Sequence, residues 1–241
     1  KAAEESRIAL QLDKSFEAYR ARGLVLMNTG AENMQEAVDA FRSAIAINKN
    51  FPDVHLFLGI AYKNLGDFDS AEEAFLSAYA LDPKNAIALT EISRAYFADG
   101  RYTQAAQYAE EAVRIKPENP RLYGDLGINY YKMQDYNRAI PELKLATYGG
   151  KVEGSNSDTL TVEGLPLDYD LRIMSYYWYY GLALAYNNNC REAVPVFQEL
   201  LNTVPNDETA VYNANFGLDV CQQNLNGTPT PGPGDDEEEP A

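Results

Sequence analysis

The stretch that decides the fold spans residues 52–83 and reads PDVHLFLGIAYKNLGDFDSAEEAFLSAYALDP. Gly59 is followed by Tyr62 on one side of a glycine-containing turn, and Ala71 is followed by Phe75 on the other. Apolar residues recur at helical spacing in both halves, and a proline closes the second half, where it cannot continue a helix. The stretch therefore predicts two helices of about 12–14 residues joined by a short turn.

The same pattern returns at a fixed interval of 34 residues, so that further units begin at Ala86 and Pro120. Looser copies occupy residues 16–51 and 174–207. The residues that mark the two regular copies are Ile92, Tyr96, Gly100, Ala105 and Pro117 in the first, and Leu126, Gly127, Tyr130, Ala139 and Leu143 in the second. No single unit can bury its apolar face alone, so we expect the units to stack.

This pattern resembles the tetratricopeptide repeat, over roughly residues 1–148 and 174–225. The resemblance implies an all-α fold, a right-handed superhelical solenoid of about five helix pairs, whose first helices line a concave groove. The expected organisation is helix pairs at 16–51, 52–85, 86–119, 120–148 and 174–207, an insertion at 149–173, a capping helix at 208–225 and a tail at 226–241.

Three segments depart from the repeat. Residues 149–173 carry turn formers around the β-prone Thr159–Val162, which predicts an inserted loop with a short two-stranded hairpin. This insertion is either a tolerated excursion or a flap over the groove. Residues 226–241 are Pro/Gly-rich and acidic, as in a linker or tail. Residues 2–12 align with a second helix only, so the chain is expected to open halfway through a repeat.

Composition excludes several classes of function. Asp plus Glu number 36 against 20 Lys plus Arg, and this acidic chain is a poor partner for nucleic acid. Two cysteines and one histidine are too few for a zinc-finger or iron–sulfur framework. No apolar run reaches the roughly 18 residues of a membrane span. His55 has no serine or cysteine nucleophile beside it, so we predict no enzyme, no metal and no cofactor.

The two cysteines, Cys190 and Cys221, fall in the turn of the fifth pair and near the end of the capping helix. Because the end of one first helix lies near the turn of its predecessor, the two Cα atoms could approach within the roughly 4.4–6.8 Å that a disulfide needs. The alternative is two unrelated buried thiols. A disulfide would favour an oxidising, extracytoplasmic compartment over the cytoplasm.

The groove positions implied by the resemblance carry cations and aromatic rings. The candidates for peptide contact are Lys63, Arg94, Phe97, Arg121, Tyr131, Lys132, Trp178 and Tyr186. Acidic residues at these positions are few, chiefly Glu17 and Asp53. We therefore expect an acidic-hydrophobic peptide or protein segment as the partner. The run Asp235–Glu239 has the same character, so self-association is expected if a neighbouring molecule's tail enters the groove.

These expectations lead to one function and two alternatives. The leading hypothesis is a protein–protein interaction scaffold that binds a peptide or protein segment in the concave groove. The first alternative is a regulatory or targeting segment of a larger protein, whose other domain lies upstream of residue 1. The second is a purely structural module that assembles through its ends.

Overall fold

The computed structural model describes residues 14–153 and 158–226. The chain divides into two compact units, Lys1–Ile115 and Lys116–Ala241, and each is described by itself. The expectations for residues 2–12 and for the tail after Asn226 lie outside the described residues.

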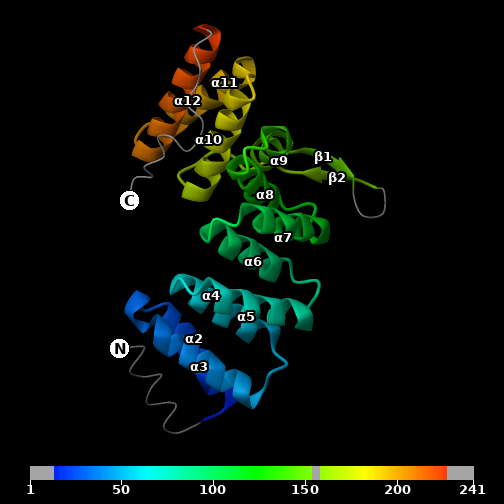
Figure 1. Cartoon of the computed structure of the whole chain (residues 1–241), viewed down its shortest axis with the longest axis vertical. Coiled ribbons are helices and arrows are strands. Elements are labelled where there is room, and N and C mark those ends of the chain that lie inside the picture. The colour runs from blue at the N-terminus through cyan, green and yellow to red at the C-terminus, as the bar shows by residue number, and fades with distance from the viewer. Residues whose placement is uncertain (1–13, 154–157, 227–241) are drawn as a thin grey trace. The chain divides into compact units, whose positions relative to one another are not determined.

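The described part of unit 1, residues 14–115, contains three antiparallel helix pairs (Figure 1). The first helix of each pair packs on the second, and each second helix packs on the first helix of the next pair. The pairs are α2 (Phe16–Met27) with α3 (Met34–Ile47), α4 (Pro52–Asn64) with α5 (Phe68–Leu81), and α6 (Ala86–Ala98) with α7 (Tyr102–Ile115). The longer first turn holds the 3₁₀ helix η1 (Ala31–Asn33).

In unit 2, residues 116–153 and 158–226 form two helix pairs, a hairpin and the further helix α12 (Figure 1). Its elements are α8 (Pro120–Lys132), α9 (Tyr136–Tyr148), β1 (Gly150–Glu153), β2 (Thr159–Val162), α10 (Leu171–Tyr186), α11 (Cys190–Thr203) and α12 (Glu208–Asn226). The terminal helix α12 packs on α10 and α11. The predicted all-α fold, with five helix pairs, an inserted hairpin and a capping helix, is confirmed.

The helix pairs close because a small residue in the first helix receives a large side chain from the second. A Cβ added to Gly59 would meet the Phe75 ring at 2.5 Å, so only glycine allows this approach. The same contact recurs between Gly23 and Phe41, Gly127 and Leu143, and Gly181 and Phe197. The repeat spacing of small and aromatic residues is therefore the spacing of interhelical contacts.

The turns and helix starts follow from local chemistry. Asp67 and Asn85 accept hydrogen bonds from the first free backbone N–H groups of α5 and α6, as N-cap residues do. The turn after α4 needs a positive φ, which Gly66 supplies at 77°. In unit 2, Gln134 and Asn188 take that left-handed conformation instead, at 60° and 59°.

The inserted hairpin is joined to unit 2 at its base. Its two strands are antiparallel, with Gly150 opposite Val162 and Glu153 opposite Thr159. The Tyr177 hydroxyl of α10 donates to the Leu165 carbonyl at 2.8 Å, and the Leu165 N–H donates to the Ala146 carbonyl of α9 at 2.8 Å. From this base, the hairpin extends away from the helices of unit 2 (Figure 1).

A disulfide between Cys190 and Cys221 joins the start of α11 to the last third of α12, with the Cα atoms 5.4 Å apart. This is the predicted pair. Beside it, the Asn224 side-chain amide donates to the Ala185 carbonyl at the end of α10, at 2.9 Å. The C-terminal end of α12 is therefore fixed to the C-terminal end of α10.

Candidate functional site: the first-helix faces of the two units

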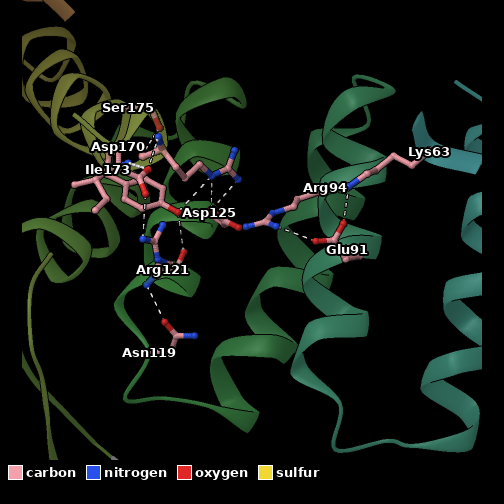
Figure 2. Close-up of polar contacts among 11 residues, drawn as sticks. Lys63, Glu91, Arg94, Asn119, Arg121, Asp125, Asp170, Ile173 and Ser175 are labelled. Atoms are coloured by element: carbon pink, nitrogen blue, oxygen red, sulfur yellow. Dashed lines mark hydrogen bonds and ion pairs between the residues drawn. The ribbon is translucent and has the colours of Figure 1, made fainter. Parts of the chain in front are cut away.

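The main polar feature of unit 1 is a carboxylate held between two cations. Glu91 of α6 is 8% exposed, and its two carboxylate oxygens bind different partners. Lys63 of α4 donates to one oxygen at 2.5 Å, and Arg94, one turn along α6, donates to the other at 2.8 Å. Figure 2 shows Lys63 and Arg94 reaching Glu91 from opposite sides. This Lys63–Glu91–Arg94 triad carries one positive charge overall.

A second ion pair joins the first two first helices of unit 1. Arg20 of α2 binds Asp53 of α4 at 2.5 Å, and each side chain is a little over one third exposed. This pair is neutral and exposed, so it contributes little free energy. It joins α2 to α4.

Apolar side chains flank the triad along the three first helices. Ile87 is 62% exposed, and Ile60 and Phe97 are half-buried. The Phe97 ring lies 5.3 Å from the Tyr102 ring, centroid to centroid. We call this set, together with the half-buried Leu24 and Met27 of α2, the apolar row of unit 1.

In unit 2, charged groups on the first helices are paired across the insertion. Arg121 of α8 binds Asp170, the N-cap of α10, at 3.3 Å (Figure 2). Arg172 donates to the buried Asp125 at 2.7 Å, and the Tyr176 hydroxyl donates to the same carboxylate at 2.6 Å. These bonds fix α10 against α8, so that the repeat resumes in register after the hairpin.

This buried network shifts the proton affinity of its members. Burial lowers the pKa of Arg172, but the attraction of Asp125 outweighs it, and the pKa of the guanidinium lies above its usual range. Burial, followed by the charge of Asp125, raises the pKa of the Tyr176 phenol. Arg172 therefore stays charged and Tyr176 stays neutral, which is the combination that the hydrogen bonds require.

Two of the aromatic groove candidates are buried rather than exposed. Tyr131 is 2% exposed and Trp178 is 7% exposed. The prediction that these rings line an open groove needs correction, because α10 packs on α8, α9, α11 and α12 and has little free surface. The candidates Lys132 and Tyr186 are half-buried, and Lys132 Nζ lies 5.7 Å from the Tyr179 ring centroid.

The sequence did not identify the two buried carboxylates. Glu91 and Asp125 were not among the expected groove residues, because an isolated acidic residue on a helix resembles a solvated one. The signal in the sequence was a cation on a neighbouring first helix. Lys63 of α4 pairs with Glu91, and Arg172 of α10 pairs with Asp125. The predicted cations Lys63 and Arg94 are therefore brought together by a residue that was not predicted.

Other chemistry is limited in the part of the chain that the structure describes. Over residues 14–153 and 158–226, no three His, Cys, Asp or Glu side chains are grouped so that they could hold a metal ion. His55 contacts the Lys49 carbonyl through Nε2, at 2.9 Å. No helix in these ranges has the length and apolar character to cross a membrane.

Comparison with known proteins places the repeats in a family. Two sequence models of the tetratricopeptide repeat match the chain, one over residues 58–120 and the other over residues 96–148. The small glutamine-rich tetratricopeptide repeat-containing protein 2 of Mycosarcoma maydis is 30% identical over 106 residues, which are 44% of this chain and 30% of that protein. The type IV pilus assembly protein PilF of Pseudomonas aeruginosa is 27% identical over 124 residues, 51% of this chain and 48% of PilF. The chain thus spans less than half the length of these relatives.

Solved structures share the fold at low sequence identity. The MamA protein of Desulfovibrio magneticus RS-1, from residue 41 to its end, matches with a TM-score of 0.63 and 20% identity, over 81% of this chain and 98% of that one. YrrB, whose structure is described as a TPR protein with an unusual peptide-binding site, matches with a TM-score of 0.56 and 22% identity, over 78% and 90% of the two chains. The repeat models, the relatives and the helix pairs agree, and the chain therefore contains tetratricopeptide repeats over residues 58–148.

Proposed function

We propose that the chain is a protein-interaction scaffold that binds an extended protein segment on the first helices of unit 1, α2, α4 and α6. One observation carries the proposal: the Lys63–Glu91–Arg94 triad lies beside the apolar row of unit 1. Exposed apolar groups next to oriented charges are typical of protein interfaces. Similar proteins support it, because YrrB is described with a peptide-binding site and the peroxisomal targeting signal receptor of Eremothecium gossypii is 28% identical over 113 residues.

The triad defines the chemistry of the partner. Glu91 offsets one of the two cations, so this face suits fewer acidic side chains than the sequence suggested. We expect a segment whose apolar side chains lie on Ile60, Ile87 and Phe97, with a carboxylate near the triad. The apolar contacts supply most of the affinity, and the charge selects the register.

Site-specific photo-crosslinking tests the face directly. Benzoylphenylalanine in place of Phe97 of α6 should crosslink a native partner, whereas the same group in place of Tyr79 of α5 should not. Tyr79 is the matched control, because it is a half-buried aromatic on a second helix of the same unit. Equal crosslinking at both positions, or crosslinking at Tyr79 alone, would move the interaction to another surface.

A charge reversal gives the second test. With the crosslinked partner, Arg94→Glu should weaken binding about tenfold or more, since one charge-assisted contact is lost and a repulsion is added. Arg114→Glu is the control, because Arg114 is 69% exposed on the second helix α7 and pairs only locally with Glu111. The proposal fails if both variants bind as the parent does, at low and at high salt.

A further inference from the structure

We propose that the outer edge of strand β1 is a self-association surface, on which β1 of a second copy of this chain pairs antiparallel. Val152 of one copy would face Val152 of the second copy. The two hairpins would then form one four-stranded sheet, in the order β2, β1, β1, β2. A dimer of this kind would carry two partner faces, and that meaning rests on the proposed function, whereas the pairing itself does not.

The hairpin presents a strand edge. Within residues 14–153 and 158–226, the sheet has two strands, and β2 is the strand that pairs with β1. At the base, a Cβ added to Gly150 would meet the Leu145 side chain of α9 at 2.9 Å, and beyond it the strands extend away from the helices of unit 2 (Figure 1). One row of β1 backbone N–H and C=O groups therefore points away from β2. Such a row is a template for a further strand.

The side chains of β1 alternate between the two faces of the sheet. Lys151 and Glu153 lie on one face and are exposed, and Val152 lies on the other and is half-buried. Within the hairpin, Lys151 is opposite Thr161 and Glu153 is opposite Thr159, so β2 offers neither of them an opposite charge. A second β1 would supply both.

One antiparallel register pairs these charges. When a two-fold axis passes through Val152, Lys151 of each copy is opposite Glu153 of the other, and the two valines meet on the other face. Opposite charges facing each other stabilise a strand pair, and like charges destabilise it. Moving the axis by one residue centres it on Lys151 or on Glu153 and sets that charge against itself. Moving it by half a residue pairs the charged face of one strand with the apolar face of the other.

The charge pattern therefore favours a second copy over other strands. A lone lysine on an edge strand opposes pairing with another chain. Glu153, two residues further on, gives Lys151 a partner that is in reach only when a second β1 lies antiparallel. The strand has four residues, so the contact is small and the association is weak and dependent on concentration.

A single cysteine at the axis tests the pairing in the full chain. The two native cysteines are bonded to each other, so Val152→Cys adds the one free thiol. Facing residues of an antiparallel pair have Cα atoms about 4.5–5.5 Å apart, a distance that a disulfide spans. Mild oxidation should therefore give a covalent dimer, measured by mass without reductant, at a rate that rises with protein concentration.

Leu160→Cys is the matched control. Leu160 is half-buried like Val152 and lies directly opposite it in the hairpin. In the proposed sheet the two copies of Leu160 are three strand spacings apart, about 14 Å, which is too far for a disulfide. This variant should therefore stay monomeric under the same oxidation.

Charge variants in the Val152→Cys chain test the register. Lys151→Glu should slow dimer formation about fivefold or more, because both ion pairs become repulsive. Adding Glu153→Lys restores both pairs in reversed order, so the rate should recover. Lys144→Glu is the control, because Lys144 is an exposed lysine of α9 and its reversal changes the net charge equally. Each rate is divided by the rate at which that thiol reacts with a small reagent, which removes the effect of neighbouring charges on the thiol itself.

The outcomes separate the possibilities. Dimer from Val152→Cys but not from Leu160→Cys, lost on the single reversal and recovered on the exchange, supports the pairing. Faster crosslinking from Leu160→Cys would place the contact on β2 and overturn the proposal. Absence of dimer from Val152→Cys, or a rate that Lys151→Glu leaves unchanged, overturns it as well. None of these results bears on the scaffold function, whose test uses Phe97 in unit 1.

Discussion

Replacing both Cys190 and Cys221 by serine should destabilise unit 2 by about 3.5 kcal/mol. The disulfide joins two residues that are 31 positions apart in the sequence, and the loop that it closes contains α11 and most of α12. Constraining a loop of that length removes about 12 cal/mol/K of entropy from the unfolded chain, which corresponds to about 3.5 kcal/mol at 25 °C. For a unit with roughly a hundred described residues, each kcal/mol corresponds to about 4 °C, so the midpoint of its thermal transition should fall by about 10–15 °C.

Calorimetry of the full chain, with hydrogen exchange measured in parallel, is the assay. The oxidised parent should lose the same stability when a reductant is added, while the serine variant should not respond to the reductant. Amide protection should fall first in the C-terminal half of α12, where Asn224 loses its fixed position beside Ala185. An unchanged transition in the serine variant, with α12 equally protected, would refute the view that the disulfide holds this helix in place.

Three further changes should have defined effects. Gly59→Ala should cost about 1–3 kcal/mol in urea denaturation, because the new methyl group overlaps the Phe75 ring, and adding Phe75→Leu should recover part of the loss. Tyr176→Phe should cost about 1–3 kcal/mol in the same assay, since the buried Asp125 carboxylate loses a donor, and no loss would mean that Arg172 alone satisfies it. Burial raises the pKa of Tyr177 to about 12, whereas an unfolded tyrosine titrates near 10. The unfolded chain therefore releases this proton first, and the free energy of unfolding should fall as pH rises from about 10 to about 12. Urea denaturation across this window checks the prediction, and Tyr177→Phe should show a weaker fall.

The helix pairs were predictable because one contact fixes the sequence pattern. Gly59 and Phe75 must meet for α4 and α5 to close, so their spacing recurs wherever the pair recurs. The disulfide was predictable for a related reason, since repeat register alone brings Cys190 near Cys221. Both inferences needed only the 34-residue period of the sequence repeat.

The surface of the first helices was less predictable, because it depends on which neighbours each helix has. Trp178 and Tyr131 occupy positions that are open in a regular array, but α10 packs on four other helices and both rings are buried. Glu91 shows the opposite failure. Its carboxylate is buried and paired with Lys63 from another repeat, and periodicity says nothing about charge pairing between repeats.

The inserted hairpin is closed at its base, so the length of the insertion does not affect the geometry of the repeats. Its base is closed by the bonds from Leu165 to Ala146 and from Tyr177 to Leu165, and Gly164 lies so close to the Thr147 carbonyl that a Cβ there would overlap it. Residues added between β1 and β2 would therefore leave α9 and α10 in place. This position is a permissive site for protein engineering, where an epitope or a reporter domain can be inserted. It is also a site at which loop length can change during evolution at little cost in stability.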